Sequence, residues 1–369
     1  MKLNPLRRCW AEIDLSALRF NAAALRNLPG PGAGLMAVVK SDGYGHGLEQ
    51  VAGALRSDVD WFCVANVTEA LRILDYLPKN RPPILILSPL LPEEYHTATA
   101  HGFSCCVSNA NEVEQYAAAA ESLGQIAKLH AVVDTGMGRM GASVAEWNSL
   151  VRSVEQNPFC ILEGVATHFP NADEDPVFTR NQIAKFRSLT ESLHCEIHLA
   201  NSAGMIDFSE EIDFATQARV GLSLYGISPV GETRINLRPV LTLKSRITII
   251  RDIDPGTTIS YGSTFTADRP MQVATVAAGY GDGYPRHLSG QGTDVLISGT
   301  RCPLLGRVTM DQIIVDVSHL ENVSTGDEVI LIGASGSETI SAFEIAEKSG
   351  TIPWEILTGI TSRVERCFF

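Results

Sequence analysis

A lysine stands directly after an apolar run in the segment AVVKSDGYGHG, where an amine could be presented to a ligand. Lys40 follows the run 35–39 and precedes three glycines, which let the chain approach a ligand closely. A lysine amine is the side chain that forms Schiff bases with carbonyl ligands. The segment is not a nucleotide-binding P-loop, because its lysine precedes the glycines instead of following them. Taken alone, the pattern also fits an ordinary lysine in a solvated loop.

Other residues that bind anions or transfer protons also follow apolar runs. They are Arg139 in VVDTGMGRMG, His168 in ATHF, Asn201 and Ser202 in HLANSAG, and Arg219 and Gly221 in ARVGLSLYG. Taken singly, each arginine also fits a structural ion pair, and the histidine fits a satisfied residue at a strand end. Ser202 also fits an ordinary helix start, although a helix start is itself an anion site. Together, a lysine, two arginines, a histidine and small phosphate-compatible residues on five loops favour a functional site.

Short apolar runs typical of buried parallel strands recur up to about residue 225. They are 35–39, 61–65, 84–88, 103–107, 128–133, 162–169, 196–200 and 214–220. Between them we expect helices, among them Ser16–Leu28, Asn109–Leu123 and Ser143–Val154. Eight strands alternating with helices predict an α/β fold, a closed (β/α)8 TIM-type barrel with the reactive residues at the carboxyl ends of its strands. The same count also fits an open doubly wound sheet, and the last run is the least regular because it is polar in the middle.

The pattern of apolar and polar residues changes after residue 238. The segments LTLKSRITII, QVATVAAG, TDVLISG, QIIVDVS and DEVILIG alternate Val, Ile and Thr with polar residues, with Asp-Pro-Gly and Gly-Asp turns between them. This pattern predicts an all-β domain with one short helix near Ser341–Lys348. We therefore expect a barrel domain at 1–238 and a C-terminal β domain at 239–369.

The composition is that of an acidic globular protein. The chain has 369 residues, a net charge of -13 and 45% hydrophobic residues. It has no basic stripe, so we expect neither nucleic acid nor a membrane surface as a partner. The eight cysteines lack the paired spacing of zinc and redox sites, which indicates reduced thiols and no metal. Because we find no secretory signal and no apolar stretch of membrane-spanning length, we expect a cytoplasmic location.

Eight motifs resemble those of the alanine racemase family and occur in the family's order. They are AVVKSDGYGHG, DTGMGRMG, THF, NSAG, ARVGLSLYG, SYGSTF, GYGDGYPR and MDQ. The similarity runs from about residue 10 to the last residues, and the first motif is highly specific. It implies an eight-stranded α/β barrel followed by a β domain, pyridoxal 5′-phosphate as cofactor, and a homodimer with shared active sites. The implied activity is that of an isomerase that interconverts L-alanine and D-alanine and so supplies D-alanine for peptidoglycan.

The resemblance also implies catalytic roles. Lys40 would hold the cofactor as an aldimine and act as one of two opposed bases. The other base resembles Tyr261, which the partner subunit would supply on the L-enantiomer side. A phenol ordinarily titrates at a pH of about 10, so it needs cationic or hydrogen-bonding help, and His168 with Arg219 behind it fits that role. A guanidinium at Arg219 can donate to the pyridine nitrogen without giving up its proton, which weakens the electron sink and limits transamination.

Further residues are implied for binding. The cofactor set is Lys40, Tyr44, Arg139, His168, Asn201, Ser202, Arg219, Gly221, Leu222 and Trp354. The substrate set is Arg139, Met310, Asp311 and, at the mouth of the channel, Tyr280. Three positions depart from the family's pattern, since Trp354 replaces a tyrosine of the phosphate cradle, Thr309 replaces a cysteine, and Val132 replaces a lysine whose carbamate positions the arginine. Two points stay open: whether a chloride ion or a side chain orients Arg139, and whether Trp354 reaches the phosphate, forms a hydrogen bond elsewhere or only packs.

Proteins of other classes share parts of this pattern. A cofactor-carrier protein with a similar barrel and lysine would lack the β domain and its tyrosine. A fold-related pyridoxal-phosphate decarboxylase would carry an acidic residue at the position of Arg219, and a barrel aldolase would use a bare Schiff-base lysine. Among racemases, the sequence leaves serine and broad specificity open.

Overall fold

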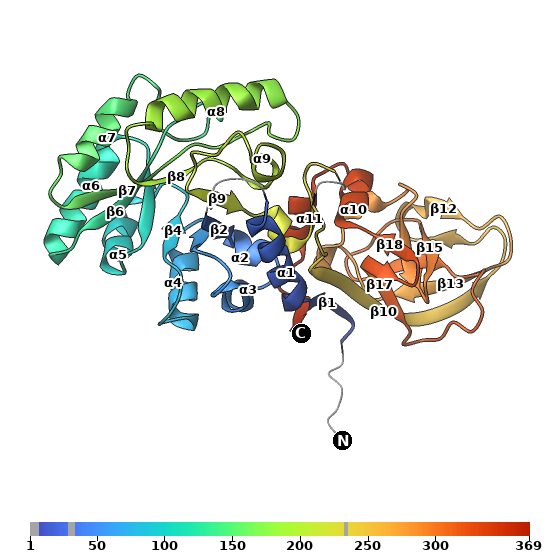
Figure 1. The fold of residues 1–369 in the computed structure, drawn as a ribbon. Coiled ribbons are helices and arrows are strands. Elements are labelled where there is room, and N and C mark those ends of the chain that lie inside the picture. The colour runs from blue at the N-terminus through green and yellow to red at the C-terminus, as the bar shows by residue number, and fades with distance from the viewer. Residues whose placement is uncertain (1–6, 29–33, 232–234) are drawn as a thin grey trace. The chain divides into compact units, whose positions relative to one another are not determined.

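The computed structural model describes residues 7–28, 34–231 and 235–369, which fall into two compact units (Figure 1). One unit contains Ser16–Gly43 and Leu48–Arg238 and forms a barrel. The other contains the described residues up to Leu15, the segment Tyr44–Gly47 and Pro239–Phe369, and it consists mainly of strands.

Eight parallel strands close into a barrel. They are β2 (Gly34–Val38), β3 (Trp61–Val64), β4 (Ile84–Ile86), β5 (Ser104–Val107), β6 (Ala127–Val132), β7 (Cys160–Ala166), β8 (Glu196–His198) and β9 (Gln217–Val220). The last strand pairs in parallel with the first, with Gly34 opposite Gln217 and Ala37 opposite Val220. This closure confirms the predicted TIM-type barrel and excludes the open sheet. Of the predicted run 214–220, which is polar in the middle, residues 217–220 form a strand, in which Arg219 is buried.

One helix precedes the first barrel strand, and the others follow barrel strands and surround them (Figure 1). They are α1 (Leu15–Arg26), α3 (Leu48–Leu55), α4 (Val67–Tyr76), α5 (Tyr95–Ala100), α6 (Ala110–Leu123), α7 (Trp147–Glu155), α8 (Pro176–Thr190) and α9 (Ser202–Asp207). Asn109 caps α6 as predicted, since its side chain accepts a hydrogen bond from the Glu112 N–H at 2.9 Å. The expected start at Ser143 is wrong, because Ser143 forms a turn with Glu146 and α7 begins only at Trp147. In the described part of the chain, no helix combines the length and the apolar character needed to cross a membrane.

The second unit is built on one large, mostly antiparallel sheet. Its strands are β1 (Cys9–Ile13), β10 (Leu241–Ile253), β13 (Met271–Val276), β14 (Asp294–Ile297), β15 (Thr300–Leu305), β16 (Ile313–Asp316), β17 (Glu328–Ser335), β18 (Glu338–Ile340) and β19 (Glu365–Phe368), and a separate hairpin contains β11 (Thr258–Ile259) and β12 (Phe265–Thr266). The sheet folds back on itself, because β17 pairs with β10 as well as with β14 and β18.

The N-terminal strand belongs to this second unit. β1 lies antiparallel to β10 and parallel to β19 in the same sheet. The segment Tyr44–Gly47 also groups with this unit. The structure therefore differs at both segments from the expected division into 1–238 and 239–369, because each segment makes its packing contacts with the β unit.

Two helices complete the second unit, α10 (Ala342–Ser349) and α11 (Pro353–Gly359). The first confirms the short helix expected near Ser341, whose hydroxyl caps it through the Glu344 N–H at 3.1 Å. The second, α11, was not predicted from the sequence.

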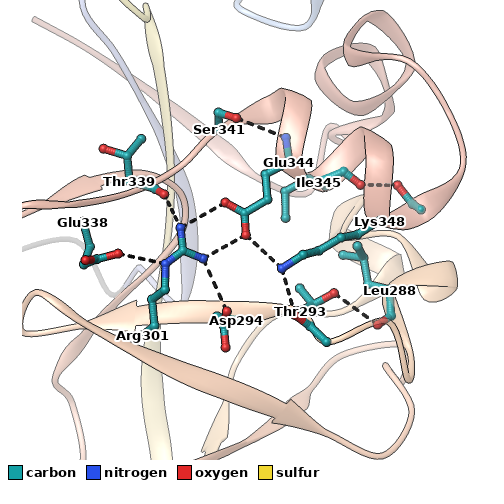
Figure 2. A network of polar contacts seen from close by, with 12 residues as sticks. Leu288, Thr293, Asp294, Arg301, Glu338, Thr339, Ser341, Glu344, Ile345 and Lys348 are labelled. Carbon is teal, nitrogen blue, oxygen red and sulfur yellow. Dashed lines mark hydrogen bonds and ion pairs between the residues drawn. The ribbon is translucent and has the colours of Figure 1, made fainter.

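A cluster of ion pairs holds α10 against the strands (Figure 2). The Arg301 guanidinium on β15 donates to Glu338 at 2.8 Å, to Glu344 at 2.9 Å and to the Thr339 carbonyl at 2.6 Å. Lys348 reaches Glu344 from one turn further along α10, at 2.9 Å. Several partners share one guanidinium, so the cluster fixes the helix more firmly than an isolated surface pair would.

Candidate active site

Four of the predicted reactive residues lie at the carboxyl ends of barrel strands. Lys40 follows β2, His168 follows β7, Ser202 follows β8, and Arg219 is the next-to-last residue of β9. In a parallel barrel the carboxyl ends of all strands meet at one face. The barrel fold therefore brings these four residues to one end, as the sequence predicts.

The backbone after Lys40 makes an unusual turn. In α2 (Lys40–Tyr44) the three residues that follow the lysine have φ of 54°, 55° and 61°, which is left-handed backbone. Such a conformation costs a non-glycine residue about 1–3 kcal/mol and persists only where the surroundings impose it. Here the Ser41 N–H donates to Glu69 at 2.7 Å, and Arg72 donates to the Asp42 carboxylate at 2.7 Å. Contacts with α4 thus fix the loop that carries Lys40.

Lys40 is half-buried rather than solvated. Burial lowers the pKa of its amine, the charges of Arg139 and Arg219 lower it further, and Glu69 opposes the shift. The net pKa lies below the ordinary lysine value. A larger fraction of the amine is therefore unprotonated near neutral pH, which suits a nucleophile or a base.

Arg219 is only 6% exposed, and its terminal N–H groups are all used inside the barrel. One terminal nitrogen donates to His198 Nδ1 at 2.6 Å and to the His198 carbonyl at 2.9 Å. The other donates to the Thr167 carbonyl at 2.8 Å and to His168 Nδ1 at 3.0 Å. The Nε–H group has no partner among the described residues, and no carboxylate in the described part of the chain contacts the guanidinium. The structural ion-pair interpretation of Arg219 is therefore wrong.

The neighbouring histidine is neutral at physiological pH. Burial lowers the pKa of His168 to about 3, and the charges of Arg219, Arg139 and Lys40 contribute to the shift. Because its Nδ1 accepts from Arg219, the ring proton sits on Nε2. His168 can therefore help another group through a hydrogen bond but not as a cation.

His198 also belongs to this site, although the sequence motifs did not predict it. Its ring is fully buried and accepts from Arg219, and burial, followed by the charge of Arg219, lowers its pKa well below the ordinary value. The strand motif EIHLA contained the available signal, a histidine in a buried strand three residues before Asn201, where the motif NSAG begins. Strand periodicity alone does not distinguish such a histidine from a residue that only fills the core.

Arg139 lies on a loop that Asp134 organises. The Asp134 carboxylate accepts hydrogen bonds from the N–H groups of Gly136, Met137 and Gly138 at 2.8, 2.8 and 2.9 Å. The arginine itself is exposed, and its positive charge acts on both Lys40 and His168. The Asp134 carboxylate therefore orders the loop that carries Arg139, in a chain that has Val132 in place of the carbamylated lysine.

Small residues after β8 and β9 form a cluster of polar groups. The Ser202 hydroxyl oxygen accepts from the N–H groups of Gly221 at 3.1 Å and Ser223 at 3.3 Å, which leaves its own hydrogen to donate elsewhere. The Ser223 hydroxyl is buried and has no partner among the described residues. Asn201 uses its amide within the fold, capping α9 through the Gly204 N–H at 2.9 Å. Leu222 follows Gly221 at the start of a short helical turn and is buried.

Tyr44 and Trp354 lie on two segments of the second unit that pack together. A side chain at Gly45 would place its Cβ 2.2 Å from the Leu357 carbonyl oxygen of α11. Arg366 donates to the Gly45 carbonyl at 3.0 Å. The backbone between β2 and α3 therefore rests against the helix that carries Trp354.

Tyr261 is 70% exposed in the single chain. It begins a short helical turn after Ser260, whose φ is 64° and whose hydroxyl donates to the Arg307 carbonyl at 2.7 Å. The turn presents the phenol to solvent. This residue belongs to the second unit, whereas Lys40 belongs to the barrel unit.

The second unit brings together three residues of the predicted substrate set. Tyr280 N–H donates to the Thr309 carbonyl at 3.0 Å, and Gly281 N–H donates to the Met310 carbonyl at 2.8 Å. Asp311 pairs with Arg363 at 2.7 Å. Tyr280 and Met310 are both exposed, at 41% and 53%, so this pair of loops presents them at a surface.

Comparisons with known proteins show the family to which this chain is similar. The N-terminal domain model of alanine racemase matches residues 13–229, and the C-terminal domain model matches residues 240–368. An alanine racemase of Halothermothrix orenii is 39% identical over 98% of this chain and 96% of its own length. The solved alanine racemase of Streptomyces lavendulae has a TM-score of 0.91 at 32% identity, covering 99% of this chain and 98% of that one. That of Bartonella henselae, solved with covalently bound pyridoxal phosphate, has a TM-score of 0.89 at 28% identity, covering 98% and 99%.

Both family models, the curated relative and the solved structures extend over the barrel and the β unit alike, so the similarity is not confined to the fold of one part. The chain belongs to the alanine racemase family of isomerases.

Proposed function

We propose that this protein interconverts L-alanine and D-alanine with pyridoxal 5′-phosphate as its cofactor. The observation that carries the proposal is the arrangement of Lys40 and Arg219. An amine of lowered pKa and a guanidinium with one remaining N–H donor occur at the same end of the barrel. These groups match the carbonyl and the basic ring nitrogen of a pyridoxal cofactor. The relative from Bartonella henselae that was solved with covalently bound pyridoxal phosphate supports the choice.

The polar cluster after β8 and β9 fits the phosphate of this cofactor. Ser202 retains a hydroxyl hydrogen to donate, and the buried Ser223 hydroxyl lacks a partner among the described residues. A buried hydroxyl without a partner is unfavourable, and an anion would satisfy it. Asn201, Gly221 and Leu222 would shape this cradle, and Tyr44 and Trp354 would be further contacts.

Lys40 would anchor the cofactor and serve as the base on the D-enantiomer side. When bound, the cofactor supplies an electron sink for the charge that develops at the substrate α-carbon. The lowered pKa of Lys40 keeps more of its amine ready to accept the α-proton. Arg219 retains its proton at neutral pH, so it donates a hydrogen bond and does not act as an acid.

The opposite proton transfer would fall to Tyr261 of the partner subunit. The exposure of this phenol in one chain is consistent with its use at an interface. One base removes the proton bound to the α-carbon, and the other delivers a proton to the opposite face, so the configuration inverts without net consumption of protons. Neutral His168 would assist Tyr261 of the partner subunit by hydrogen bonding.

We further propose that Arg139, Tyr280, Met310 and Asp311 bind and admit the amino acid. Arg139 brings a positive charge that complements the substrate carboxylate. The barrel would hold the cofactor, and the C-terminal unit would supply the phenol and the dimer contacts. We place the homodimer in the cytoplasm, where D-alanine is made for peptidoglycan and where the eight free thiols would stay reduced.

A racemisation assay tests this function. Purified protein supplied with pyridoxal 5′-phosphate is incubated separately with L-alanine and L-serine, and the enantiomers are separated by chiral chromatography. We expect conversion of L-alanine to an equal mixture, with a higher kcat/KM for alanine than for serine. Formation of ethylamine and carbon dioxide instead would reject the proposal in favour of a decarboxylase, and faster turnover of serine would reject the assignment of substrate.

A further inference from the structure

A continuous line of polar side chains leads from Arg219 into the barrel interior. Arg219 donates to His198 Nδ1 at 2.6 Å, His198 Nε2 lies 2.8 Å from His130 Nδ1, and His130 Nε2 lies 3.4 Å from the Glu163 carboxylate. Ser104 on β5 also donates to this carboxylate. The four side chains of this line come from β9, β8, β6 and β7, respectively. The proposed function gives no role to His130 or Glu163.

This line of four side chains is shielded from water except at Glu163. The side chains of His130 and His198 have no exposed surface, and Arg219 is 6% exposed. The Glu163 side chain is 21% exposed, so the carboxylate lies where the buried line reaches partial solvent access.

Only one arrangement of protons allows a hydrogen bond between each of the three neighbouring pairs in this line. Arg219 is always a donor, so His198 Nδ1 must be bare and its proton must sit on Nε2. That proton then points to His130 Nδ1, which must also be bare. The remaining His130 proton sits on Nε2 and points to Glu163, an acceptor when ionised. A further proton on either Nδ1 would face another N–H hydrogen across the same contact and abolish that hydrogen bond, so both rings are neutral.

The backbone is adjusted to place Glu163 at the end of the line. Leu129 pairs with Leu162 but His130 pairs with Gly164, so Glu163 is an extra residue in β7, a bulge. Bulges re-aim side chains at barrel rims and near active sites. A Cβ at position 164 would lie 2.3 Å from His130 Nδ1, so the ring fits only beside glycine.

Among the described residues, the buried positive charge of Arg219 has no counter-charge in direct contact with it. A buried charge is strongly unfavourable unless a counter-charge or hydrogen bonds compensate it. The hydrogen bonds of Arg219 go to two carbonyls and two neutral rings, and in the described part of the chain no carboxylate touches it. Burial raises the pKa of Glu163, but hydrogen bonds from His130 and Ser104 and the charge of Lys128 lower it, and the net pKa lies below the ordinary value, so the carboxylate stays ionised.

We propose that Glu163 is a positioning residue that supplies the counter-charge of Arg219 from the interior of the barrel, through the polarised rings of His130 and His198. Its charge stabilises the arrangement in which both rings donate toward Glu163 and accept from Arg219. This holds the guanidinium in one orientation, with Nε–H as its remaining donor. The inference rests on the proposed function in one respect only, which is the use of this Nε–H to bind the cofactor.

Neutron diffraction from crystals of the cofactor-loaded enzyme grown in heavy water shows each exchangeable proton directly, and it needs no variant. We expect deuterium on Nε2 of His198 and His130 and none on either Nδ1. Deuterium on Nδ1 of either ring would overturn the inference, since the line from Arg219 to Glu163 would then be broken.

A double-mutant cycle tests the coupling between the two ends. Glu163→Gln keeps the shape but removes the charge, and it is combined with Arg219→Gln. Denaturant unfolding at one protein concentration gives the folding equilibrium constant of each variant. We expect Glu163→Gln to reduce this constant at least about twofold more in the wild-type background than beside Arg219→Gln, because groups in one hydrogen-bonded network do not act additively.

Glu196→Gln is the matched control. Glu196 lies on β8, pairs in register with Gly164 and bonds to Thr216 and Gln217 rather than to a histidine. Its effect should be the same in both backgrounds. Equal losses for Glu163→Gln in both backgrounds would contradict the proposal. Neither measurement uses racemase activity, so failure of the proposed function is seen separately in the alanine assay.

Discussion

Burial, rather than salt bridging, sets the ionisation of the reactive side chains at the barrel mouth. Lys40 and His168 both lose basicity because they are removed from water and face positive charge. Arg219 also has a lowered pKa, first through burial, but a guanidinium tolerates such a shift and remains charged. The site thus combines an amine that can give up its proton, a neutral imidazole and a permanent cation, which a solvated cluster of the same residues would not.

Replacement of Lys40 by alanine is expected to abolish racemisation and stable cofactor attachment, because no other lysine follows a barrel strand at this face. Borohydride treatment followed by peptide mass spectrometry locates the attachment point in the wild type. We expect the reduced cofactor on the peptide that contains Lys40. The matched control is Lys185→Ala, an exposed lysine of α8, which should leave both properties unchanged. Reduced cofactor on another lysine would contradict the assignment.

His168 is expected to make stability depend on pH. Its folded pKa of about 3 lies below the unfolded value of about 6.5, so the unfolded chain binds the extra proton between these limits. Stability from this group is therefore complete above pH of about 6.5 and is lost as pH falls toward 3, by up to about 1.4 kcal/mol per pH unit. His168→Gln should flatten the slope of unfolding free energy measured in denaturant at pH 7, 6 and 5. The exposed His287→Gln should not, and an unchanged slope in the first variant would refute the shift.

At the scale of elements, most barrel strands were predictable because they are buried on both faces and are therefore apolar runs. β7, which is partly exposed, and β9, which contains Arg219, are less regular. The start of α7 was not predictable, because Ser143 has the residue type of a cap but uses its hydroxyl in a separate turn. β1 was missed because a five-residue strand has little periodicity and its partners lie more than 200 residues away in sequence. His130 and Glu163 were missed because their roles depend on a bulge and on pairing across strands, which no local pattern records.

The packing of Tyr44–Gly47 against α11 gives a prediction about one glycine. Gly45→Ala should destabilise the protein in two ways, since φ is +81° and the new Cβ would lie 2.2 Å from the Leu357 carbonyl oxygen. Gly102→Ala is the matched control, with φ of +66° and open space around it. Positive φ costs a non-glycine residue roughly 1–2 kcal/mol, and overpacking adds about 1–3 kcal/mol. Equal midpoints of thermal unfolding for the two variants would show that the contact with α11 is not tight.

At the scale of the whole molecule, the proposed bases belong to different compact units of the chain. Lys40 lies in the barrel unit and Tyr261 in the β unit, where the phenol is exposed. Because the proposed function assigns the second base to the partner subunit, it requires two copies of the chain, with Lys40 of one and Tyr261 of the partner subunit at each site. In a dimer of two-fold symmetry each chain gives and receives one such residue.

Subunit exchange between two inactive variants tests this account most directly. Lys40→Ala and Tyr261→Phe proteins are mixed in equal amounts, dissociated, reassembled with pyridoxal 5′-phosphate and assayed for alanine racemisation. Half of the dimers are then hybrids in which one site has both bases and the other has neither. We predict recovery of about one quarter of the wild-type activity, from one intact site in each hybrid. Activity no higher than that of the separate variants, in dimers shown to have exchanged, would contradict the claim that Lys40 works with Tyr261 of the partner subunit.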